Sequence, residues 1–343
     1  MGYFIAAVCF WMITAILFLC TIWIYMKLAS SVRNKEAFPG WMYKIGHAIR
    51  GRGSDPYEDI ANAAAWKEAT LFLIILVIVN GILFSVKYLE AHNADAALYA
   101  CLLAEFWIIL AVNFLWNIFK IGVLVIHTVR KSPKEIHDYA STNAVVGLAF
   151  LTSFLLMLTL TLTGVPAKPV KIQIADSDVT IGKTKASELL KDGFTFSMRS
   201  PEEIITNHRD SHFYYGEFAD LVRDGKSYGI VSLTPEKSDT AMLKDCVITY
   251  YTITAGKGQF DEIKINGKEV SGLKWDEFAD RKLIDVFSMT PADYKEMKGD
   301  DNYRLQLQTH PYVLWKRYTI EADFHEGEPY KYDVMAQHTI WEE

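Results

Sequence analysis

Long stretches with few or no charged residues divide the first half of the chain into four apolar segments. They occupy about residues 3–26, 69–88, 98–127 and 143–164. A helix rises about 1.5 Å per residue and the hydrocarbon core of a bilayer is about 30 Å thick, so each segment is long enough to cross a membrane. The pattern therefore predicts an α-helical bundle of four transmembrane helices over residues 1–164.

Basic residues are concentrated in two of the three loops between these segments. Seven Lys and Arg residues lie in 27–68 and three lie in 128–139, whereas 88–97 contains none. Loops rich in Lys and Arg stay in the cytoplasm, so we expect both termini to be extracytoplasmic. Residues 40–52 mix aromatic and basic side chains, which predicts a short helix lying at the anionic inner leaflet.

The pattern changes after the proline-containing segment 165–169. Short runs typical of strands occupy residues 170–174, 178–181, 194–198, 226–233, 246–254, 260–265, 303–308, 315–324 and 331–339. Helices are predicted over 185–191, 275–286 and 291–297, and turns at Gly193, 224–225 and 266–267. We therefore expect an extracytoplasmic α+β domain over residues 165–343.

Charge and cysteine content separate the two halves. Residues 1–164 carry 12 Lys and Arg against 10 Asp and Glu, and residues 165–343 carry 23 against 31. The acidic second half argues against a nucleic-acid partner. Cys246 is alone in that half, so it has no partner there for a disulfide.

The second half contains a faint internal repeat. Residues 179–184 and 263–268 are similar, and each run precedes a predicted helix. Two related subdomains, 170–255 and 256–343, are one interpretation. The other is coincidence, because a strand followed by a turn and a helix is a common sequence of elements.

Three segments of the second half carry a resemblance to a known group of proteins. They are residues 182–194 (GKTKASELLKDGF), 221–226 (LVRDGK) and 243–248 (LKDCVI). They resemble segments of uncharacterised surface domains found in lipoproteins and multi-pass membrane proteins of Gram-positive Firmicutes. The resemblance covers about residues 170–275. It implies a bacterial cell-surface setting and no catalytic residue.

One cluster in the second half has the side chains of a metal site. His208, Asp210 and His212 lie on one face if their segment is extended, and such residues bind Zn²⁺. A solvated loop is the competing interpretation, and no second pair of His or Cys completes a ligand set. We therefore expect no metal, and the chain contains no Gly-x-Ser-x-Gly, His-Glu-x-x-His, Walker or Rossmann signature.

The third apolar segment carries a stripe of polar side chains. Helical geometry places Glu105, Asn113, Asn117 and Lys120 within an arc of about 120°. Polar groups in a membrane usually face a bundle interior, a cavity or another subunit. Three interpretations stay open: helix packing with the charged ends reaching toward water, a path for protons or ions, and contact with a partner membrane protein.

The short loop 88–97 predicts that the second and third segments form an antiparallel hairpin. Residues at equal depth in such a hairpin have a constant sum of residue numbers. With the turn centred near residues 92–93, Asn80 is level with Glu105. We therefore predict that Glu105 faces Asn80 inside the bundle and forms a hydrogen bond with it, in which the carboxyl group donates.

These patterns favour a non-enzymatic, multi-pass plasma-membrane protein. Its extracytoplasmic domain is expected to bind a partner or ligand of the cell envelope, as a sensor-like protein or an accessory subunit. The alternative is a membrane enzyme or transporter component that uses the polar stripe. Transport by this chain alone is disfavoured, because it shows no inverted repeat. The expected partners are the lipid bilayer and a membrane or envelope protein, without a cofactor.

Overall fold

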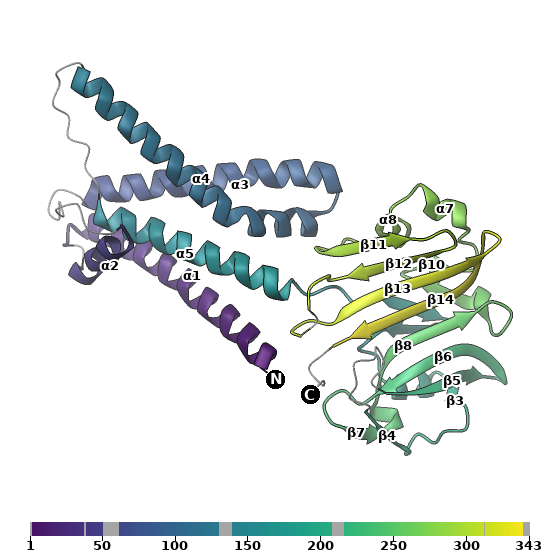
Figure 1. Cartoon of the computed structure of the whole chain (residues 1–343). Coiled ribbons are helices and arrows are strands. Elements are labelled where there is room, and N and C mark those ends of the chain that lie inside the picture. The colour runs from purple at the N-terminus through teal and green to yellow at the C-terminus, as the bar shows by residue number, and fades with distance from the viewer. Residues whose placement is uncertain are drawn as a thin grey trace. The chain divides into compact units, whose positions relative to one another are not determined.

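The computed structural model describes residues 2–37, 39–50, 62–129, 139–207, 216–311 and 313–338. The chain divides into two compact units, one formed by Ala6–Leu162 and the other by Met1–Ile5 together with Thr163–Glu343. The first unit is helical and the second is rich in β-strands (Figure 1).

The helices of the first unit fit the apolar segments of the sequence. They are α1 (Gly2–Asn34), α2 (Gly40–Arg50), α3 (Asn62–Ala91), α4 (Ala94–Val129) and α5 (Ala140–Thr163). All of them except α2 are long and apolar enough to cross a membrane. The predicted layout of four long apolar helices is therefore confirmed, and it supports a multi-pass membrane protein.

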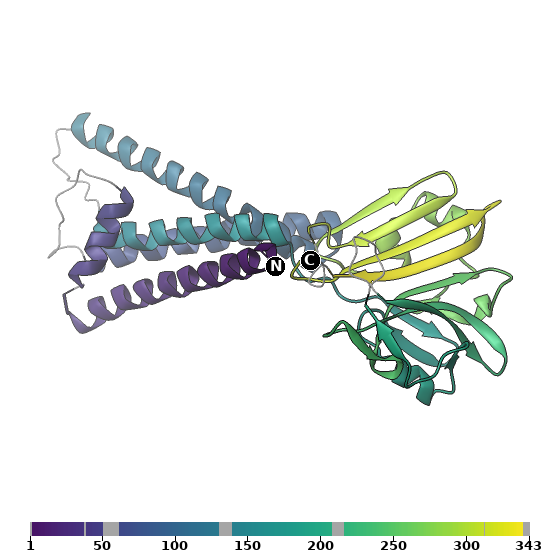
Figure 2. The same cartoon turned by 60° about the horizontal axis from the view of Figure 1, so that its bottom comes forward.

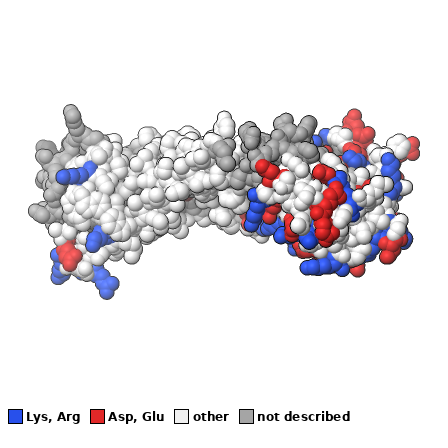
Figure 3. Space-filling view, turned by 90° about the horizontal axis from the view of Figure 1, so that it is seen from below, with Lys and Arg blue, Asp and Glu red and all other residues white. Residues whose placement is uncertain are grey.

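The surface of the helical unit matches this conclusion. On the face seen in Figure 3, a long band carries no charged side chain, and Lys and Arg gather at the end that holds α2. Large apolar side chains are exposed along the helices, among them Val77 at 72% and Leu115 at 63%. Exposed apolar side chains of this kind are expected on helices that face lipid.

The short helix α2 packs into the bundle as well as lying at its end. Met42 and Tyr43 are buried in a cluster with Ile24 and Leu28 of α1 and with residues of α3 and α5. The predicted helix is thus present over Gly40–Arg50, and one of its faces contributes to the core of the bundle.

Among its described residues, the second unit contains three antiparallel sheets. Its strands are β1 (Lys171–Ile174), β2 (Ser177–Thr180), β3 (Thr195–Phe196), β4 (Ile204–Thr206), β5 (Glu217–Arg223), β6 (Lys226–Thr234), β7 (Thr240–Met242), β8 (Val247–Thr254), β9 (Ile263–Ile265), β10 (Lys268–Glu269), β11 (Tyr294–Lys298), β12 (Asn302–Leu307), β13 (Arg317–His325) and β14 (Glu328–Gln337). The sheet orders are β11-β12-β13-β14-β8-β6-β5-β3, β10-β9-β1-β2 and β4-β7. The helices are α6 (Ala186–Lys191), α7 (Trp275–Ala279) and α8 (Leu283–Val286).

The predicted turns lie where the backbone needs them. Asp224 and Gly225 join β5 to β6 with φ of 51° and 73°, and Asn266 and Gly267 join β9 to β10 with φ of 48° and 82°. Positive φ at two successive positions is typical of the tight turns that match the twist of a hairpin. These dipeptides therefore set the two hairpins, as the sequence indicates.

One apolar core fills the β-rich unit. Its buried residues come from all three sheets and from α6, α7 and α8. The two similar runs of the sequence overlap β2 and β9, and these strands lie in hairpins that pair through β1 and β9. The eight-stranded sheet draws strands from both 170–255 and 256–343, and the two related subdomains stay a prediction.

The structure corrects two predicted helices. Residues 291–297 do not form a helix, because Tyr294–Lys298 pair as edge strand β11 with β12. Residues 275–286 form two short helices, α7 and α8, separated by the charged residues 280–282. Long-range strand pairing overrides the helical pattern in the first case. The sequence prediction also missed β5, the partner of β6.

Candidate functional site

Polar side chains join the long helices of the bundle in pairs. Thr14 of α1 contacts Thr159 of α5 at 3.1 Å, and Thr21 contacts Thr152 at 3.2 Å. Tyr25 of α1 contacts Thr70 of α3 at 3.1 Å. Hydrogen bonds of this type hold transmembrane helices together, because lipid offers no other partner to a polar group. These hydroxyls therefore have a clear packing role.

The predicted contact between Asn80 and Glu105 is present. Asn80 Nδ2 donates to Glu105 Oε2 at 2.7 Å and to the carbonyl of Leu76 at 3.0 Å. The antiparallel hairpin of α3 and α4 thus places the two side chains at the same depth, as the numbering predicts. The donor is the Asn80 amide, whereas the sequence led us to expect the carboxyl group to donate.

A second polar contact lies between α3 and α4, nearer to the end that holds α2. Lys120 forms an ion pair with Glu68. Trp116 Nε1 donates to Glu68 Oε1 at 2.9 Å. The side chains of Lys120 and Glu68 are 21% and 11% exposed, so both charges are largely withdrawn from the surface. Lys120 therefore has a partner within the bundle.

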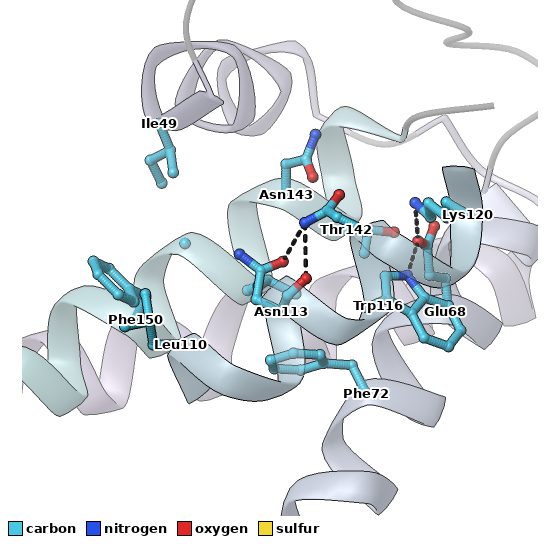
Figure 4. A pocket seen from close by; sticks show the side chains of 13 residues that line it. Ile49, Glu68, Phe72, Leu110, Asn113, Trp116, Lys120, Thr142, Asn143 and Phe150 are labelled. Atoms are coloured by element: carbon cyan, nitrogen blue, oxygen red, sulfur yellow. Dashed lines mark hydrogen bonds and ion pairs between the residues drawn. The ribbon is translucent and has the colours of Figure 1, made fainter. Parts of the chain in front are cut away.

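A pocket of about 420 Å³ opens beside this ion pair (Figure 4). It is lined by Ile49, Glu68, Phe72, Leu110, Asn113, Trp116, Asn117, Lys120, Thr142, Asn143, Val146, Gly147 and Phe150. Asn117 Nδ2 donates to the Asn113 backbone oxygen at 2.8 Å and to its side-chain oxygen at 3.3 Å. The pocket volume falls in the range of small-ligand sites.

Two glycines let α2 approach α5 at the edge of the pocket. A Cβ atom at Gly46 would stand 1.9 Å from the carbonyl oxygen of Ala140. A Cβ atom at Gly147 would stand 2.3 Å from Cγ2 of Ile49. Larger residues at either position would push the two helices apart. The glycines therefore fix where Ile49 meets the pocket.

The structure brings together three of the five predicted membrane residues. Asn113, Asn117 and Lys120 line the pocket, whereas Glu105 and Asn80 form their own contact and do not line it. The sequence prediction missed Glu68, which precedes the second apolar segment. The hairpin rule would have found it, because Glu68 is level with Asn117 when Asn80 is level with Glu105. No comparable signal points to Thr142 or Asn143.

The predicted metal candidates His208, Asp210 and His212 lie outside the described residues. Within the part of the chain that the structure describes, no group of three or more His, Cys, Asp or Glu side chains is arranged to hold a metal ion. The polar pocket of the bundle is therefore the candidate site.

No protein-family model, curated protein or solved structure matches this chain. The chemistry of a ligand for the pocket is therefore inferred from the polarity and charge of the side chains that line it.

Proposed function

We propose that the chain is a non-enzymatic, multi-pass plasma-membrane protein whose β-rich unit is extracytoplasmic and binds a protein or ligand of the cell envelope. In this proposal it acts as a sensor-like protein or as an accessory subunit of a membrane complex. The bundle anchors it, and the β-rich unit supplies the binding surface. A Gram-positive origin rests on the resemblance of residues 182–194, 221–226 and 243–248.

The observation that carries the proposal is the complete core of the β-rich unit. Its buried apolar residues run from Val170 to Ala336 and include residues of three sheets and three helices. The unit therefore needs no residue of the bundle to bury its apolar side chains. A domain with its own core, attached to a membrane bundle, is suited to work in water beside the membrane.

A candidate contact surface lies on the two-stranded sheet of β4 and β7. Ile204 and Met242 are register partners there. Their exposed fractions are 57% and 43%. Adjacent exposed apolar side chains on the surface of a domain favour contact with another protein.

Cysteine labelling tests the orientation. In a chain without its four native cysteines, Ala91→Cys and Ser238→Cys are expected to react with an impermeant thiol reagent in intact cells, whereas Ser54→Cys is expected to react only after lysis. The charge of the loops supports this result. Labelling of Ser54→Cys with none of Ser238→Cys would overturn the proposed orientation.

Photo-crosslinking tests the binding role. A photoreactive amino acid at Met242 in the full chain is expected to give a discrete cross-linked product in living cells. The matched control is the same amino acid at Lys295, an exposed position on the edge strand β11, which is expected to give none. Absence of a product from Met242, or equal products from both positions, would contradict a partner surface on β4 and β7.

A membrane enzyme or transporter component is the second candidate, and the polar pocket favours it. The pocket holds the Lys120–Glu68 pair beside Asn113 and Asn117. Under this alternative, the purified chain alone shows activity or ion flux in proteoliposomes, and Lys120→Met abolishes it. A purified chain that shows neither activity nor ion flux, and that copurifies with a partner protein from cells, favours the first proposal.

A further inference from the structure

The lining of the bundle pocket changes in character along the helix axes. Lys120 of α4, Glu68 of α3 and Thr142 of α5 lie toward the end that holds α2, together with Trp116, Asn117 and Asn143. Phe72, Leu110, Val146 and Phe150 lie further along the same helices, away from that end. One end of the pocket is therefore polar and the other is apolar.

The length of this gradient follows from helix geometry. Thr142 and Phe150 are eight residues apart on α5, which corresponds to about 12 Å along the axis. The polar end lies near the end of the bundle, where lipid head groups are found, and the apolar end lies at the depth of acyl chains. The pocket thus matches the polarity profile of one leaflet of a bilayer.

The pocket is open at the surface of the bundle. Two of its lining residues, Ile49 and Leu110, are 39% and 42% exposed. Helix α4 diverges from α3 and α5 toward its carboxyl end in both views (Figures 1 and 2). Exposed apolar side chains follow the pocket along α4, among them Phe114 at 65% and Phe119 at 62%. A molecule of the bilayer can therefore enter the pocket from the side.

Among the described residues that line the polar end, one carries a positive charge and one a negative charge. Lys120 and Glu68 are already paired, and the remaining polar groups there are uncharged amides, a hydroxyl and the Trp116 indole. A purely anionic head group would meet Glu68 as well as Lys120. A head group with both charges can place its phosphate near Lys120 and its ammonium near Glu68, so the charge pattern favours a zwitterion.

We propose that this pocket binds the head group and the first acyl-chain segment of a single zwitterionic phospholipid. The lipid enters from the leaflet on the α2 side, between α4 and α5. Asn113 and Asn117 hydrogen-bond to the glycerol and ester region, and Phe72 and Phe150 contact the acyl chain. Under the proposed orientation, the leaflet on the α2 side is the cytoplasmic one. This is the only part of the inference that rests on the proposed function.

The test uses the full chain in nanodiscs that contain phosphatidylethanolamine and phosphatidylglycerol in equal amounts. After release into the gas phase, native mass spectrometry is expected to show one phosphatidylethanolamine molecule retained per chain. Retention of phosphatidylglycerol instead, or of no single lipid, would overturn the proposal. This measurement needs neither a protein partner nor a known orientation, so its failure is distinct from failure of the proposed function.

Two variants address the two ends of the pocket. Val146→Phe fills the apolar end and Asn117→Leu removes a polar contact, and each is expected to weaken retention about tenfold. Leu115→Phe adds a ring on the exposed surface of α4 outside the pocket and is the matched control, with retention unchanged. Equal lipid retention by all three variants would overturn the proposal. The lipid selectivity of the wild-type chain is measured separately, so a variant that fails to fold does not decide the outcome.

Discussion

In the helical bundle, the carboxyl groups of Glu68 and Glu105 each lie between α3 and α4. In the β-rich unit, Glu321 and Asp333 lie opposite each other on neighbouring strands, on one face of a sheet. Arg304 Nε contacts Glu321 at 2.6 Å, and Tyr250 donates to Asp333 at 2.6 Å. Both regions thus satisfy acidic side chains with nearby donors.

The difference lies in what replaces a lost partner. Water can reach the sheet face, where the Glu321 side chain is 25% exposed. The Glu68 side chain in the bundle is only 11% exposed and lipid offers no donor to replace a lost one, so an unpaired Glu68 keeps much of its desolvation cost. We therefore expect substitutions at the bundle contacts to cost more than substitutions on the sheet.

The largest effect is expected for Lys120→Met. This change leaves Glu68 with Trp116 as its remaining donor and removes its charge partner, at a cost of about 3 kcal/mol in the free energy of unfolding. Lys87→Met is the matched control, because the Lys87–Glu90 pair is 42% and 57% exposed and such pairs contribute about 0.5 kcal/mol. Unfolding of the full chain in detergent micelles measures both, and equal losses would remove the distinction between the two pairs.

A double variant sharpens this comparison. Glu68→Gln combined with Lys120→Met removes both charges and keeps an acceptor for Trp116. It is expected to recover about half of the loss caused by Lys120→Met. Because Glu68→Gln alone also removes the charge partner of Lys120, the coupling in a double-mutant cycle is expected to exceed about 1.5 kcal/mol. Additive losses would show that the two side chains act independently.

The contact between Asn80 and Glu105 is expected to contribute less. Glu105→Leu removes one acceptor from the Asn80 amide, which keeps the Leu76 carbonyl, so the cost is about 1 kcal/mol. Glu105→Gln keeps the length and an acceptor, and is expected to be nearly silent in the same unfolding measurement. Loss of function in a stable, assembled Glu105→Gln protein would instead show that the carboxyl group has a role beyond packing.

The comparison between the two bundle contacts also shows what the sequence can predict. The sequence predicts the contact between Asn80 and Glu105, because a short turn fixes the depth of every residue in the α3–α4 hairpin. The same rule places Glu68 beside Asn117, yet Glu68 was missed because it precedes the uncharged run. The pocket itself depends on how α2 and α5 pack, and the numbering rule of the hairpin does not extend to either helix.

In the β-rich unit, local signals predicted elements better than partners. The dipeptides at 224–225 and 266–267 marked tight turns correctly, since positive φ at both positions is a local demand. Strand β14 pairs with β8, whose residues lie far away along the chain, and no local pattern encodes that choice. The wrong helix at 291–297 has the same origin, because pairing with β12 makes it a strand.

The smallest effect is expected from Glu321 on the sheet. Burial, and then the nearby carboxylates Asp333 and Asp323, raise the pKa of Glu321 above its usual value of 4.5, although Arg304 opposes the shift. Between the pKa of Glu321 in the unfolded state and its higher pKa in the folded state, the folded state binds more protons. The contribution of Glu321 to stability therefore falls as pH rises through that range.

Glu321→Gln removes this dependence. We therefore expect the variant to gain stability relative to the wild type as pH rises from 4 to 7, measured as the difference in Tm of the β-rich unit by circular dichroism. A variant that instead loses stability relative to the wild type as pH rises would show that the pair with Arg304 outweighs burial and repulsion.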